Sequence, residues 1–169
     1  MNRYDQIWFK FNSYAEWERI EGGLKQIEVG KVGVFGVNGN DHIYYRIGTV
    51  GDSRSSGNDW QRLDGSLKHI SVGSKSVWGV NNKDDIYEMQ NISFDINGKI
   101  NFKWRKVEGK LKNISVYSGT IWGTNSADYI YFKKTARNGF KYYYDSVHHE
   151  IKLRIIRVKV HPGNKLKVR

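Results

Sequence analysis

The chain has 169 residues, no cysteine, one proline and 18 glycines, and its formal net charge at pH 7 is +11. The absence of cysteine excludes disulfides, thiolate metal ligands and a cysteine nucleophile, and it favours a reducing compartment. No run of about 18 apolar residues predicts a membrane span, and residues 1–11 show no signal-peptide pattern. The 6 Trp, 11 Tyr and 7 Phe, with frequent Val and Ile, predict strands around a substantial core rather than helices.

The first predicted element is a strand at residues 4–11, around the segment DQIWFK. This segment matches DYIYFK at Asp128–Lys133, near the end of a later unit of the chain. We therefore expect the chain to open with the last strand of a sheet whose earlier strands come from elsewhere. In closed ring-shaped folds, such a strand completes the sheet begun at the C-terminus and removes two unpaired edges.

Three repeats follow, at about residues 17–48, 60–90 and 104–133, within a repeat region that spans residues 1–132. Their opening phrases are WERIEGGLKQIEVG, WQRLDGSLKHISVG and WRKVEGKLKNISVY, whose leading tryptophans lie 43 and 44 residues apart. Their closing phrases are VFGVNGNDHIYY, VWGVNNKDDIYE and IWGTNSADYIYF. Self-similarity at a fixed period of this size predicts a repeat architecture.

Each repeat predicts four short strands: one at the leading tryptophan, one at the I-x-V stretch, one at the V-W-G stretch and one at the D-x-I-Y stretch. A four-stranded unit of about 40–45 residues has the size of a β-propeller blade. One blade cannot bury both faces of its sheet, so neighbouring blades stack and their inward aromatic residues form a continuous core. The predicted fold class is therefore all-β, a β-propeller. The glycines after the second aromatic residue are expected to allow close backbone approach, at Gly36, Gly79 and Gly123.

The last segment, residues 133–169, carries 11 Lys and Arg against 2 acidic residues, whereas residues 1–132 carry 17 against 15. It echoes the start of a repeat, with Tyr142 at the tryptophan position, but it lacks the glycine and the V-W-G phrase. Apolar and basic residues alternate at Ile151–Val160, which predicts a strand with one cationic face. Such a face can capture lipid A phosphates, anionic lipid or nucleic acid. Nucleic acid is disfavoured because no nucleic-acid fold signature accompanies the charge.

The repeated phrases resemble those of the tectonin β-propeller family, which includes tachylectin, fish-egg lectins and slime-mould tectonins. The resemblance covers about Tyr4–Lys133, with three repeats in register. WD40 and kelch repeats fit less well, because no Gly-His opens a repeat, no Trp-Asp closes one and a double glycine occurs once. Family members usually close six blades, whereas this chain has three and a half recognisable units. The resemblance therefore leaves three explanations open: a ring completed by a homo-oligomer, a fragment of a longer propeller, or a diverged fourth unit in residues 133–169.

Resemblance to tectonins implies non-catalytic recognition of surface glycans such as bacterial lipopolysaccharide at sites between blades. Sugar sites pair a flat aromatic ring with amides and carboxylates, and each repeat supplies these groups. Repeated sites would also multiply a weak affinity. The structural alternative is that the tryptophans pack between blades while the asparagines and aspartates shape turns. The candidate ligand-binding residues are Trp60, Trp78, Asn81, Asp84, Trp104, Trp122, Asn125 and Asp128.

No phosphate-binding loop, nucleophile elbow or paired-carboxylate motif predicts an enzyme, and no cofactor is expected. His148 and His149 lie near Asp145 and Glu150, but adjacent side chains on a strand point to opposite faces, which disfavours a metal site. The alternative function is an intracellular propeller scaffold that binds protein or anionic membrane lipid, and the absence of cysteine and of a signal segment favours it. Because tectonins are both secreted and intracellular, the compartment stays open.

Overall fold

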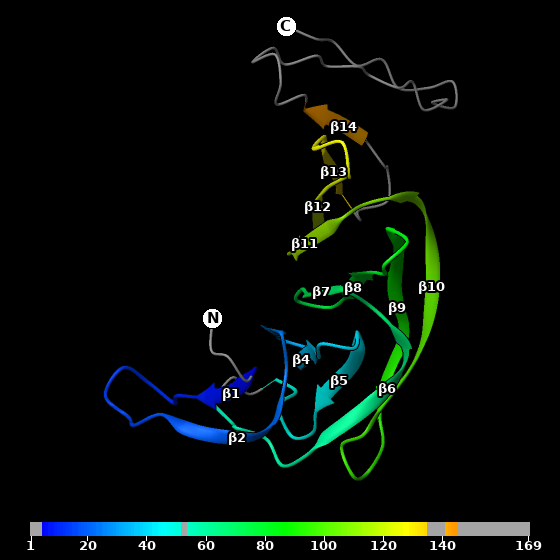
Figure 1. The fold of residues 1–169 in the computed structure, drawn as a ribbon. Helices are drawn as coiled ribbons and strands as arrows, with labels where there is room; N and C mark the ends of the chain where they lie inside the picture. Colours follow the sequence, from blue (N-terminus) through cyan, green and yellow to red (C-terminus); the bar gives the residue numbers. More distant parts are fainter. Residues whose placement is uncertain (1–4, 52–53, 135–140, 145–169) are drawn as a thin grey trace, which may run out of the picture.

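The computed structural model describes residues 5–51, 54–134 and 141–144, which form fourteen strands and no helix. The strands build one two-stranded and three four-stranded antiparallel sheets. Figure 1 shows that the sheets follow one another along an open arc. None of the described residues forms a helix long and apolar enough to cross a membrane. The structure confirms the predicted fold class, stacked blades of a β-propeller, and the described residues do not close the ring.

The strands pair in chain order within each sheet. The two-stranded sheet contains β1 (Gln6–Phe9) and β2 (Glu18–Gly23). The first four-stranded sheet contains β3 (Gln26–Gly30), β4 (Gly33–Val37), β5 (His42–Arg46) and β6 (Trp60–Ser66). The second contains β7 (His69–Val72), β8 (Val77–Val80), β9 (Asp85–Phe94) and β10 (Ile100–Lys110). The third contains β11 (Asn113–Tyr117), β12 (Thr120–Thr124), β13 (Ile130–Lys134) and β14 (Lys141–Tyr144).

The sheets are offset by one strand from the repeats in the sequence. The strand at each leading tryptophan, such as β6 or β10, pairs with the last strand of the preceding repeat and ends that sheet. This corrects the prediction that the tryptophan strand opens its own blade. It also corrects the prediction for the N-terminus, because β1 pairs with β2 as β5 pairs with β6, so β1 is the third strand of its blade rather than the last. Each repeat therefore contributes strands to two blades.

The register of β14 identifies which of its residues occupies the tryptophan position. In β6 and β10, the tryptophan lies opposite the residue that comes three places after the isoleucine of the D-x-I-Y phrase. The same place in β13 is opposite Lys141, whereas Tyr142 lies one residue further along. This corrects the assignment of Tyr142 to the tryptophan position. The three equivalent cross-strand pairs are Arg46–Trp60, Met89–Trp104 and Lys133–Lys141.

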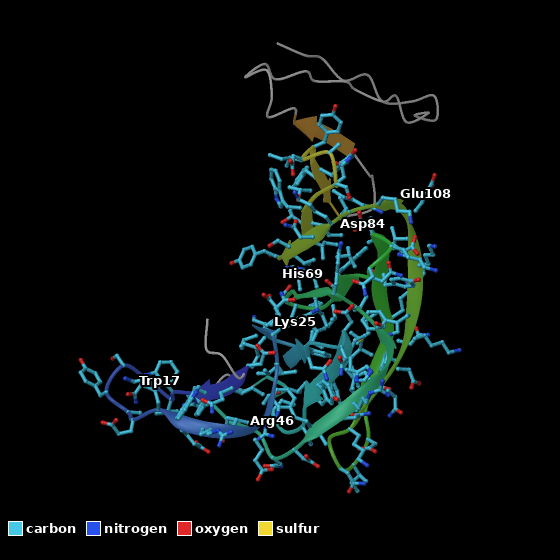
Figure 2. All side chains as sticks on the ribbon, in the orientation of Figure 1. Trp17, Lys25, Arg46, His69, Asp84 and Glu108 are labelled. Carbon is cyan, nitrogen blue, oxygen red and sulfur yellow. The ribbon has the colours of Figure 1, made fainter. Side chains whose placement is uncertain are left out.

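The core consists of apolar layers between successive sheets, and Figure 2 shows side chains filling these spaces. Strand β7 packs against β3 and β4, and β11 packs against β7 and β8. The glycine of each V-W-G phrase makes room for a leucine of the same repeat: a Cβ on Gly79 would lie 2.4 Å from Cδ1 of Leu67 and 2.9 Å from the carbonyl oxygen of His69. The close approach predicted at these glycines is confirmed, with equivalent contacts at Gly36 and Gly123.

The first four-stranded sheet is only partly covered on its N-terminal side. The β1–β2 pair provides the two outer strands of a blade and buries Ile7 and Ile20. No described strand provides the two inner strands of that blade. As a result Ile27 and Val29 on β3 are 44% and 58% exposed.

Candidate functional site

The predicted asparagines shape the tight turns between the second and third strands of the sheets. Oδ1 of Asn81 accepts hydrogen bonds from the backbone N–H groups of Lys83 and Asp85, each at 2.9 Å. Oδ1 of Asn125 accepts the equivalent bonds from Ala127 and Tyr129, at 3.0 and 2.9 Å. Their side-chain oxygens are engaged in building the turn, as the structural alternative predicted.

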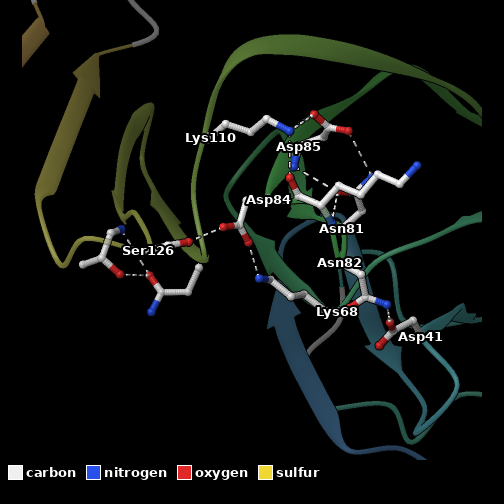
Figure 3. Close-up of polar contacts among 11 residues, drawn as sticks. Asp41, Lys68, Asn81, Asn82, Asp84, Asp85, Lys110 and Ser126 are labelled. Atoms are coloured by element: carbon white, nitrogen blue, oxygen red, sulfur yellow. Dashed lines mark hydrogen bonds and ion pairs between the residues drawn. The ribbon is translucent and has the colours of Figure 1, made fainter.

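The predicted aspartates follow these asparagines and adopt a left-handed backbone, with φ of 61° at Asp84 and 62° at Asp128. Figure 3 shows that Asp84 joins two blades, because it accepts bonds from Lys68 of its own blade and from Ser126 of the next. These two bonds lower the pKa of the Asp84 carboxyl. Asp128 pairs with Lys112, and its side chain is 71% exposed.

Asp85, the residue after Asp84, is a further acidic residue at this turn that was not predicted from the sequence. Its Oδ1 lies 2.7 Å from Nζ of Lys110 and 2.9 Å from Nζ of Lys106. Hydrogen bonds from these lysines hold the pKa of Asp85 well below its usual range. The sequence distinguishes this residue, because Asp85 is a second aspartate in the phrase NNKDD, whereas the other repeats have His42 and Tyr129 at the same position.

Trp78 and Trp122 occupy equivalent positions on β8 and β12 but differ in exposure. Trp78 is 2% exposed and packs in the apolar layer with Leu111 and Ile114 of the next blade. Its ring packs between blades, as the structural alternative predicted, and its role in binding a ligand stays a prediction. Trp122 is 50% exposed. With Trp78 and Asn125, it lines a cavity of about 420 Å³ between the second and third four-stranded sheets.

The leading tryptophans Trp60 and Trp104 join the outer strands of neighbouring blades. The indole N–H of Trp60 donates to the carbonyl of Glu21 at 2.8 Å, and that of Trp104 donates to the carbonyl of Asp64 at 2.9 Å. The two rings differ in their neighbours. The guanidinium of Arg46 lies 5.2 Å from the ring centroid of Trp60, in a cation–π contact.

A groove of about 520 Å³ lies between β6 and β10, the outer strands of adjacent blades. The rings of Phe102 and Trp104 meet edge to face there, with centroids 5.5 Å apart. At one end, the amide of Gln61 bonds to both the N–H and the carbonyl of Ile100, at 2.7 and 3.0 Å, and joins the two strands. Polar and charged residues complete the lining of the groove: Gln61, Arg62, Asp64, Asn101 and Lys103.

Of the eight predicted site residues, this groove contains Trp104 alone. The groove also places Phe102, Arg62 and Asp64 near this tryptophan, and none of them was among the residues predicted from the sequence. Phe102 could have been found, because residues two apart on a strand share one face. Arg62 and Asp64 could not, since they belong to another repeat.

Residues 5–51, 54–134 and 141–144 contain no group of three or more His, Asp or Glu residues that could hold a metal ion. The disfavoured metal cluster at His148 and His149, with Asp145 and Glu150, lies outside the described residues. The same is true of the predicted cationic strand at Ile151–Val160.

Four-stranded antiparallel sheets, stacked face to face with inner strands in contact, define a β-propeller repeat protein. A tectonin-domain family model matches residues 1–160, so this chain belongs to the tectonin family. Among solved structures, the crystal structure of human WBSCR16 is similar in fold, with a TM-score of 0.52 and 12% sequence identity. The similarity covers 79% of this chain and 41% of that one. No curated protein matches the sequence.

Proposed function

We propose that this chain is a non-catalytic lectin that binds surface glycans, such as bacterial lipopolysaccharide, in grooves between neighbouring blades. The observation that carries the proposal is the groove between β6 and β10, where Phe102 and Trp104 lie beside charged and amide side chains. Membership of the tectonin family supports it, because the family consists of β-propeller repeats rather than of enzymes.

The chemistry of the groove suits a sugar. An aromatic ring packs against the weakly apolar C–H face of a pyranose. The carboxylate of Asp64 can accept hydrogen bonds from the sugar hydroxyl groups. The guanidinium of Arg62 donates up to five hydrogen bonds in a planar fork and suits a phosphate or carboxylate on the glycan. A site of this kind would bind anionic sugars more tightly than neutral ones.

The equivalent position one blade earlier is less suited to this role. The guanidinium of Arg46 already lies over the ring of Trp60. The residue two places before Trp60 is Asn58, whereas the residue two places before Trp104 is Phe102. We therefore assign the main site to the groove with Trp104.

The test is a glycan array that includes lipopolysaccharides, probed at low and high salt with protein whose mass is fixed by light scattering. The variants Phe102→Ala and Asp64→Asn should abolish binding to defined sugars while leaving the thermal melting curve close to that of the wild type. Arg19→Ala is the matched control, since Arg19 is an exposed basic residue of the outer strand β2. It should bind like the wild type.

Two results would contradict the lectin proposal. One is the absence of sugar binding by the wild-type protein. The other is binding to every polyanion that disappears at high salt, because exposed charges are screened over about 10 Å at 0.1 M ionic strength. That second result would favour the scaffold that binds anionic lipid through residues 133–169.

A further inference from the structure

A β-bulge interrupts the outermost strand pair in the first three sheets. The register shifts at Glu21–Gly22 in β2, at Asp64–Gly65 in β6 and at Glu108–Gly109 in β10. The three glycines have the left-handed backbone that this bulge requires, with φ of 102°, 95° and 114°. Residues in a bulge are left out of the strand ladder, so their backbone groups can bond to another partner.

At the first two bulges, this partner is the tryptophan of the next outer strand. The indole N–H of Trp60 donates to the carbonyl of Glu21, and that of Trp104 donates to the carbonyl of Asp64. The rings also lie against the bulge glycines, because an added Cβ there would be 3.6 and 3.4 Å from Nε1 of the two indoles. An indole therefore fills the space beside each of these bulges.

The third bulge has no tryptophan to receive. The strand register places Lys141 at the tryptophan position of β14, and a lysine has neither a ring nor an indole N–H. Apart from chain neighbours, the only described atom within 4 Å of a Cβ added to Gly109 is Cδ1 of Ile86, at 3.4 Å. The equivalent atom of Ile43 lies 3.7 Å from a Cβ on Gly65. The isoleucine is thus common to both junctions, and the indole is the part that differs.

The cavity of about 420 Å³ between the second and third four-stranded sheets lies at this bulge. Glu108 and Gly109 contribute to its lining, and so do Trp78 and Trp122. Glu108 lies at the end of β10 that leads to the third sheet (Figure 2). Aliphatic residues form much of the remaining lining: Ile86, Val107, Leu111, Ile114 and Ile121. Pockets of about 300–1,000 Å³ with a mainly apolar lining and a few polar groups commonly hold small molecules.

We propose that this cavity binds a small planar aromatic molecule, similar in size to indole, that carries an N–H donor. Its ring takes the place that Trp104 has at the preceding junction, and its N–H donates to the carbonyl of Glu108. Trp122, which is 50% exposed, provides an aromatic surface for the ring. A sugar suits this cavity less well, because the aliphatic lining offers few partners for hydroxyl groups that lose their water.

This site is separate from the proposed glycan groove. The cavity and the groove between β6 and β10 share no lining residue. The proposal therefore does not depend on the lectin function, and either can fail without the other.

The test is a titration of the ¹⁵N-labelled full chain with indole, followed by heteronuclear NMR. We expect saturable shifts of the backbone amide of Gly109 and of the indole N–H of Trp122, with a single indole bound per chain. The analogue 1-methylindole lacks the N–H donor and should bind severalfold more weakly.

The variant Lys141→Trp restores the residue found at the other junctions. It should abolish the binding of indole and raise the melting temperature, because the chain's own ring then fills the cavity. The higher melting temperature separates this loss of binding from unfolding. Lys99→Trp is the matched control, since it makes the same change at an exposed turn outside the cavity. It should bind indole like the wild type.

Three results would overturn the proposal. The first is the absence of saturable shifts at Gly109 and Trp122 in the wild type, which needs no variant. The second is wild-type affinity for indole in Lys141→Trp, which would place the ligand elsewhere. The third is a saturable shift of the same resonances with glucose but not with indole, which would make the cavity a sugar site.

Discussion

The indole N–H of Trp60 donates a hydrogen bond to the main-chain carbonyl of Glu21, 2.8 Å away on the preceding sheet. Trp60→Phe keeps the apolar ring but removes this bond, so the free energy of unfolding should fall by about 1 kcal/mol. Urea denaturation followed by circular dichroism measures the change. Trp17→Phe is the control, because Trp17 is 60% exposed at the end of the described arc. An equal loss in both variants would show that the bond between blades is not the cause.

Gly79→Ala should destabilise the protein by about 1–3 kcal/mol, the usual cost of overpacking a core. The added methyl would lie 2.4 Å from Leu67 and 2.9 Å from the backbone oxygen of His69, and the backbone cannot move away cheaply. Thermal melting of the variant provides the measurement. Gly39→Ala is the matched control, because its nearest neighbour would be Oδ2 of Asp5 at 4.0 Å. A wild-type melting temperature for Gly79→Ala would contradict the close packing.

The bonds that Asp84 accepts from Lys68 and Ser126 should make the free energy of unfolding depend on pH in the acid range. Hydrogen bonds from Lys68 and Ser126 lower the pKa of Asp84 below its ordinary value of 3.8. Its contribution is therefore fully present above pH 3.8 and is lost as the pH falls through the lowered pKa of the folded state. Urea denaturation at several pH values should show a smaller acid loss in Asp84→Asn than in the wild type.

The control for the acid experiment is Asp128→Asn. Asp128 occupies the same repeat position as Asp84, but its side chain is 71% exposed and its described ion-pair partner is Lys112 of its own blade. It should change the pH profile less than Asp84→Asn does. Identical dependence of stability on pH in the wild type and in Asp84→Asn would contradict a stabilising role for the bonds from Lys68 and Ser126 to Asp84.

His69 should add a second pH dependence near neutrality. Burial, followed by the nearby charge of Lys68, lowers the pKa of His69 below 6.5, so the folded state resists its protonation. The unfolded chain binds that proton, and stability should fall as the pH drops below 6.5 towards the pKa of the folded state. His69→Gln introduces the residue found at Gln26 of the first repeat and should flatten this part of the profile. An unchanged slope in the variant would assign the effect to another group.

The repeats were readable from the sequence because blade packing constrains the same positions in every unit. Gly36, Gly79 and Gly123 face a leucine, and the isoleucines of β7 and β11 face an aromatic residue, so each position tolerates few side chains. These constraints predicted the all-β fold and the propeller family. They could not separate binding residues from packing residues, because Trp78 and Trp122 have the same sequence context and differ in whether a described blade packs over them.

The sequence by itself determined the period, the strand-forming phrases and the turn residues, since these depend on local conformation and on contacts that recur in every repeat. Only the tertiary structure decided how strands are shared between blades, because hydrogen-bond pairing of β5 with β6 joins segments separated by a long connection. It also decided the groove between β6 and β10, whose lining comes from two repeats. A site between blades depends on their relative placement, and no single repeat encodes that.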